Sequence, residues 1–100
     1  MKKLKIKTEW ILEAFPMTVY AYGNGTVSIT TMCPSDASWI QLALDAMSIP
    51  YECFQRNDEE TDRIEMSWEF EIQAIKEDCP KLYKEWSEQD LLNSAYRNKN

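Results

Sequence analysis

Carboxylates dominate the middle of this sequence, and they are the side chains whose type and spacing could do chemistry. Seven of them lie close together: Asp58, Glu59, Glu60, Asp62, Glu65, Glu69 and Glu71. Carboxylate oxygens are the ligands that Ca²⁺ and Mg²⁺ prefer, and two carboxylates in one cleft can act as acid and base. The segment lacks the alternating ligands and central glycine of a calcium-binding EF-hand loop. We therefore predict no metal site, no cofactor and no catalytic carboxylate pair.

The charge of the chain is distributed unevenly. Residues 36–73 hold ten acids against two arginines, a net charge of −8, whereas the whole chain carries −6. An acidic surface repels nucleic acid and anionic membranes and favours a basic partner. We therefore predict that the seven acids bind a protein with a basic surface, with no direct contact to nucleic acid or membrane. Rows of carboxylates also suggest a nucleic-acid mimic, the kind of inhibitor that phages encode.

Two residue types that many enzymes require are rare or missing. The chain contains no histidine, which removes Ser-His and Cys-His nucleophiles and most zinc sites. Its only glycines, Gly23 and Gly25, lie two residues apart, so no glycine-rich loop is available to hold a phosphate group. These absences favour a non-enzymatic protein.

One short motif is instead typical of a thiol enzyme. Cys33-Pro34-Ser35-Asp36 follows a predicted strand and opens a predicted helix, and a segment beginning Ile49-Pro50 leads into the next strand. This arrangement resembles glutaredoxins, whose active site is Cys-Pro-x-Cys or Cys-Pro-x-Ser. The resemblance covers about a quarter of the chain and implies a Cys33 thiolate stabilised by a helix N-terminus. No glycine follows Gly25 to form that family's glutathione-binding segment, and a carboxylate at Asp36 opposes thiolate formation. We expect Cys33 to be structural, with a thiol oxidoreductase as an alternative.

The elements that position these residues begin with a strand. Apolar and polar residues alternate from Arg63 to Ile72, which predicts a strand with one buried face and one acidic face. Leu4–Leu12 alternates in the same way and predicts a first strand. A short helix capped at Thr8 and ended by Pro16 is the alternative for this segment, so residues 8–15 stay open between strand and helix.

Asn24-Gly25 predicts a β-hairpin, because this pair supplies the positive φ angles of a type I′ turn. A two-residue loop at this position would pair Tyr22 with Val27 and Tyr20 with Ile29. We expect this aromatic and β-branched face to be buried.

Two helices are predicted further along the chain. Ser35 is the expected N-cap of the first, whose body runs over Ala37–Ser48. Pro80 is expected in the first turn of the second, where its missing N–H is harmless. Ser87 and Asp90 resemble a capping box for a separate final turn or two.

Together these elements predict an α+β fold in a single domain, residues 1–100. We expect a two-layer antiparallel sheet of about five strands, in the order βββαββα, covered by two or three helices. The stretch from Thr26 to about Trp86 has the order of a split βαβ, ferredoxin-like unit. The predicted core comprises Tyr20, Tyr22, Val27, Ile29, Trp39, Ile40, Ala43, Met47, Ile64, Met66, Trp68, Phe70 and Leu82.

Composition sets the class of protein. The chain is 44% hydrophobic, and its three cysteines have neither metal-type nor Cys-x-x-Cys spacing, which is typical of reduced thiols in the cytoplasm. We therefore expect a cytoplasmic, non-enzymatic interaction domain of the inhibitor or adaptor type, with a homodimer as one possibility. A homo-oligomeric ferredoxin-like domain that senses a small molecule is the first alternative, and a thiol oxidoreductase using Cys33 is the second.

Overall fold

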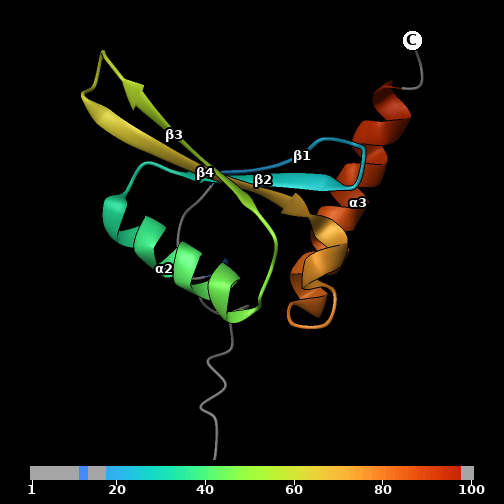
Figure 1. Ribbon diagram of the computed structural model, residues 1–100. Coiled ribbons are helices and arrows are strands. Elements are labelled where there is room, and N and C mark those ends of the chain that lie inside the picture. Colours follow the sequence, from blue (N-terminus) through green and yellow to red (C-terminus); the bar gives the residue numbers. More distant parts are fainter. Residues whose placement is uncertain (1–11, 14–17, 98–100) are drawn as a thin grey trace, which may run out of the picture.

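The computed structural model describes residues 12–13 and 18–97, and Figure 1 shows a four-stranded antiparallel sheet accompanied by helices. Its elements are β1 (Thr18–Ala21), β2 (Thr26–Thr31), α2 (Pro34–Ala46), β3 (Glu52–Asp58), β4 (Arg63–Glu71), the 3-10 helix η1 (Ile72–Ile75) and α3 (Pro80–Arg97). The prediction of an α+β fold built on an antiparallel sheet is confirmed. The described residues form four strands where about five were predicted.

The strands lie in the order β1-β2-β4-β3. The second strands of the two hairpins, β2 and β4, therefore form the centre, and β1 and β3 form the edges. Most of the predicted first strand, Leu4–Leu12, lies outside the described residues. Leu12 and Glu13 are described, both are helical, and Leu12 is buried in the core.

Within the described residues, the sheet has one covered face and one open face. Figure 1 shows α2 along one face, while α3 stands at the end of the sheet beside the turn between β1 and β2. The covered face carries the alternate side chains that the periodicity of β4 predicted, including Trp68 and Phe70. The largest fully buried side chains of the core are Trp68, Ile29, Ile40, Leu44, Ile75, Val27 and Cys79.

The predicted register of the first hairpin is wrong by one residue. Val27 pairs with Ala21, and Ile29 pairs with Val19, so a four-residue loop connects the strands. Because side chains alternate between faces, this shift moves Tyr20 from the core to the open face, where it is 56% exposed. Tyr22 is half-buried beside it.

The cause of the shift is a contact with α3. Both loop glycines have positive φ, and their backbone N–H groups donate hydrogen bonds to the Asp90 carboxylate at 2.8 Å for Gly23 and 3.0 Å for Gly25. A Cβ on Gly23 would lie 2.9 Å from the backbone nitrogen of Ser94. Asp90 therefore fixes a turn far away in sequence, and the predicted capping box of Ser87 and Asp90 is wrong because α3 is one continuous helix.

The first helix also begins earlier than predicted. Cys33, not Ser35, is the N-cap residue, and Pro34 is the first residue of α2. The helix buries a single stripe centred on Ile40 and Leu44, since Trp39 on another side is 49% exposed. Trp39 is therefore wrongly placed in the predicted core.

The end of the second hairpin differs from the prediction as well. Ile64 is 44% exposed, because the strands β3 and β4 extend beyond the helices toward the turn that joins them. Met47 and Met66 are half-buried against the core, and Leu82 is buried as predicted.

Among helices in the described ranges, none combines the length and apolar character needed to cross a bilayer.

Candidate functional site

The open face of the sheet is the most distinctive surface of the described structure. From the register it carries Thr18, Tyr20, Thr26, Ser28, Thr30, Glu52, Phe54, Arg56, Glu65, Ser67, Glu69 and Glu71. Hydroxyl groups occupy its centre, where Thr30 Oγ1 and Ser67 Oγ are 2.9 Å apart. Two large rings flank this centre, because Tyr20 is 56% exposed on β1 and Phe54 is 46% exposed on β3. Exposed aromatic side chains next to polar groups are typical of protein interfaces.

Three carboxylates meet at one end of the open face. Glu52, Glu69 and Glu71 line a hollow of about 510 Å³, together with Tyr51 and Thr26. Glu52 and Glu69 are directly opposite each other on neighbouring strands. Like charges in this position repel each other, so a cation placed between them is stabilised. The hollow can therefore accept a basic side chain from a partner.

The structure divides the seven predicted acids into separate groups. Glu69 and Glu71 lie at the hollow, and Glu65 lies on the same face, opposite Arg56. Glu59, Glu60 and Asp62 occupy the exposed turn between β3 and β4, and Asp58 ends β3. At about 3.3 Å per residue, the seven residues from Asp62 to Glu69 separate the turn from the hollow by about 23 Å. The predicted acids therefore do not form one continuous surface, since Arg56 interrupts it.

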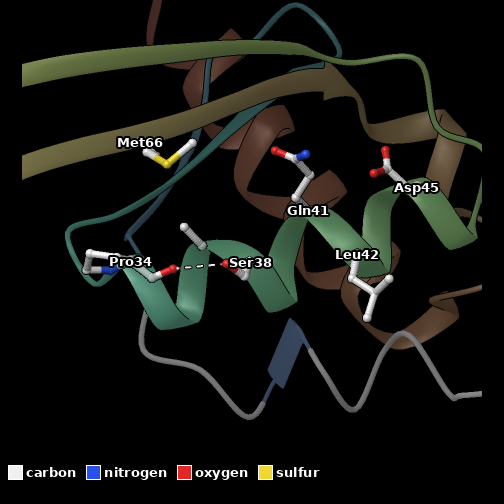
Figure 2. A pocket seen from close by; sticks show the side chains of 7 residues that line it. Pro34, Ser38, Gln41, Leu42, Asp45 and Met66 are labelled. Carbon is white, nitrogen blue, oxygen red and sulfur yellow. Dashed lines mark hydrogen bonds between the residues drawn. The ribbon is translucent and has the colours of Figure 1, made fainter.

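A second hollow, of about 340 Å³, lies between α2 and the covered side of β4. Figure 2 shows Gln41 and Asp45 on the strand side of the helix, and Leu42 directed away. The hydroxyl of Ser38 donates to the Pro34 carbonyl at 3.3 Å, so it is engaged with its own helix. A lone carboxylate beside neutral side chains offers no acid–base pair, so this hollow does not support a catalytic site.

Asp45 has a partner just outside this hollow. The Tyr51 hydroxyl donates a hydrogen bond to Asp45 Oδ1 at 2.8 Å. This bond, together with burial and the negative charge of Asp45, raises the pKa of Tyr51 above its ordinary 10.0. The bond connects Tyr51, in the segment before β3, to α2. It therefore helps to hold Tyr51 in place, and Tyr51 lines the hollow at Glu52, Glu69 and Glu71.

The three cysteines form no disulfide with one another, and their surroundings differ. Cys33 is exposed at the start of α2, and its side chain makes no capping hydrogen bond. Cys53 is exposed on β3, whereas Cys79 is buried at the start of α3, with Sγ 3.6 Å from Met47 Sδ. Within the described ranges, no cluster of three or more cysteine or acidic side chains is arranged to hold a metal ion.

Three members of the candidate site were not predicted from the sequence. Tyr20 was placed in the core because the hairpin register was shifted, and Glu52 and Phe54 were not grouped with the acids of β4. The second glycine of the turn was the available signal for Tyr20, because two positive-φ residues fit a longer loop. Nothing local in the sequence indicates that β3 pairs with β4 so that Glu52 faces Glu69.

No family model, curated protein or solved structure matches the chain.

Proposed function

We propose that this chain is a non-enzymatic interaction domain, of the inhibitor or adaptor type, whose open face binds a basic surface of a protein partner. The observation that carries the proposal is the hollow in which Glu52, Glu69 and Glu71 meet beside exposed aromatic rings. Lysine or arginine side chains of the partner would enter this hollow, while Tyr20 and Phe54 supply apolar contact area. Three cysteines that form no disulfide with one another favour a reducing, cytoplasmic setting.

The nucleic-acid-mimic form of this proposal has weaker support. A mimic needs a row of uncompensated negative charges, and Arg56 lies opposite Glu65 in the middle of the row. The charge pattern therefore favours a partner that recognises a compact acidic site over one that tracks a nucleic-acid backbone.

The experiment begins with capture of the partner from the native host and its identification by mass spectrometry. Association is then measured by surface plasmon resonance for the Glu69→Lys/Glu71→Lys variant. Its control is Glu59→Lys/Glu60→Lys, which changes the charge by the same amount at the distant turn. We expect the first variant to associate about tenfold more slowly or worse, because interface charges steer association. The control should lose much less.

Salt provides the second arm of this experiment. Raising the ionic strength from 0.1 M to 1 M shortens the Debye length from about 10 Å to about 3 Å, so wild-type association should slow. If both variants slow association equally, net charge and not the hollow is responsible. If neither does, the open face is not the binding surface. Rapid alkylation of Cys33 at about pH 6, below the ordinary thiol pKa of about 8.5, would favour the thiol-enzyme alternative instead.

A further inference from the structure

The strand β3 is an unusually open edge of the sheet. It is seven residues long, and its described side chains, Glu52 to Asn57, are all exposed. In the described part of the chain it pairs only with β4, so its outer side has no strand or helix beside it. Such an edge is a template for pairing with another strand. Its sequence also contains no proline to block that pairing.

The register shows which backbone groups point outward. Ile72 donates its N–H to the Gly25 carbonyl, so 25 and 72 form a hydrogen-bonded pair between β2 and β4. Hydrogen-bonded and non-hydrogen-bonded pairs alternate along an antiparallel ladder. Even-numbered residues of β4, like the adjacent Ile72, therefore direct their backbone groups toward β2. Odd-numbered residues of β4 direct theirs toward β3, where their partners are the even-numbered residues, as Glu69 and Glu52 show. The N–H and C=O groups of Cys53, Gln55 and Asn57 are left pointing away from the sheet.

The charges on this strand complement those of a second copy. Glu52, Phe54 and Arg56 share the open face, with the ring midway between the two opposite charges. When two copies of β3 pair antiparallel about Phe54, Glu52 of each copy faces Arg56 of the other. Registers centred on Glu52 or Arg56 place like charges together, and like charges directly opposite are destabilising. Among the registers centred on a side chain of the open face, the charge pattern therefore favours the one centred on Phe54.

Backbone geometry supports the same register. Centring on Phe54 makes Cys53 and Gln55 a hydrogen-bonded pair across the two copies. The Phe54 pair and the Glu52–Arg56 pairs are then non-hydrogen-bonded, the type in which side chains lie closest. Neither Glu52 nor Arg56 forms a salt bridge to another described side chain, and Glu52 already faces the like charge of Glu69. A second copy would supply the missing cation.

We propose that two copies of this chain pair through their β3 edges, antiparallel and centred on Phe54, to form one continuous eight-stranded sheet. The dimer joins the two open faces side by side, with the Phe54 rings and the Glu52–Arg56 pairs at the seam. This inference shares Glu52 and Phe54 with the proposed binding surface. Its test is nevertheless separate, because self-association is measured on the chain alone, without the proposed partner.

Charge exchange tests the proposal by sedimentation equilibrium of the full chain. Glu52→Arg and Arg56→Glu should each raise the dimer Kd about tenfold or more, because two symmetry-related pairs become repulsive. The double variant, Glu52→Arg/Arg56→Glu, should restore the wild-type Kd. Glu88→Arg on α3 changes the net charge by the same amount as Glu52→Arg and should leave the Kd unchanged. A dimer that survives both single changes forms through another surface and overturns the proposal, as does a protein that is monomeric at every concentration.

Cross-linking tests the register directly. In a Cys33→Ser/Cys53→Ser background, Phe54→Cys should form a disulfide-linked dimer under mild oxidation. Its Cα atoms would lie about 4.5 Å apart in a non-hydrogen-bonded pair, within disulfide range. The control Gln55→Cys should not cross-link, since the two copies of position 55 are offset along the strands beyond the limit of about 7 Å. Cross-linking at position 55 and not at 54 would overturn the register.

Discussion

The two edges of the sheet expose the same kind of backbone, but the described chain closes only one of them. At the β1 edge, Asn93 Nδ2 of α3 donates to the Ala21 carbonyl at 2.6 Å, and Gly23 touches the backbone of Ser94. At the β3 edge, no described strand or helix pairs with the backbone N–H and C=O groups that point away from the sheet. The short edge is protected by a helix, whereas the long edge carries alternating charges. The difference indicates that an edge left open in a small domain is a candidate interface.

Trp68 lies on a central strand between the two edges, and its removal should have the largest effect. It is fully buried on β4, opposite Ile29 on one side and Cys53 on the other. Trp68→Ala should lower the free energy of unfolding by about 3–5 kcal/mol through the cavity it leaves. Chemical denaturation measures this loss.

The control for this change is Trp68→Phe. It keeps most of the volume and removes an indole N–H that has no acceptor among the described residues, so we expect a loss below about 1.5 kcal/mol. An unchanged denaturation midpoint for Trp68→Ala would mean that the buried face of β4 is assigned to the wrong side.

The closed edge is tested by a matched pair of glycine substitutions. Gly23→Ala should cost about 3 kcal/mol, because its positive φ is strained for alanine and its Cβ would meet the backbone of α3. Gly25→Ala should cost about 1 kcal/mol, because it has the same strain but nothing within 4 Å of its Cβ. Thermal and denaturant unfolding give both values. Equal losses would show that α3 does not close this edge.

The smallest effect concerns the segment leading into the open edge. Tyr51→Phe should lower the free energy of unfolding by about 0.5 kcal/mol, the low end for a hydrogen bond reached by solvent. The folded-state pKa of Tyr51 is raised, so this stabilisation is fully present below pH 10.0 and declines as pH rises through the folded-state pKa. The variant should lack that alkaline loss, as denaturation at several pH values will show. A variant with the same alkaline loss as the wild type would contradict this assignment.

Local patterns predicted the individual elements better than their pairing. The alternation from Arg63 onward predicted β4 nearly to its ends, and Pro80 predicted the start of α3. These features depend on neighbours in sequence, where strand periodicity and proline chemistry act directly. For the face of Tyr20, the second glycine of the turn was a local signal, but the contact that holds this loop comes from Asp90, 67 residues after Gly23, and no local pattern shows it.

The candidate site was predictable only in part, for the same reason. The run of acids from Asp58 to Glu71 was visible, and Glu69 and Glu71 do line the hollow. The position of Arg56 opposite Glu65 depends on strand pairing, and this pairing divides the predicted surface. Composition therefore indicated that the candidate site is acidic. Which residues belong to it could be identified only from the pairing of the strands.

The carboxylate of Asp90 has a consequence for the order in which the chain folds. A hairpin usually forms early, because its strands are close in sequence and little loop entropy is lost. Here the loop of the first hairpin acquires its acceptor from a helix whose contacting residue is 65–67 positions away. We expect the strands β1 and β2 to pair with each other early, while the turn between them is still mobile. The turn becomes fixed only when α3 docks. The turn that begins the described sheet would thus be among the last parts of the molecule to become rigid.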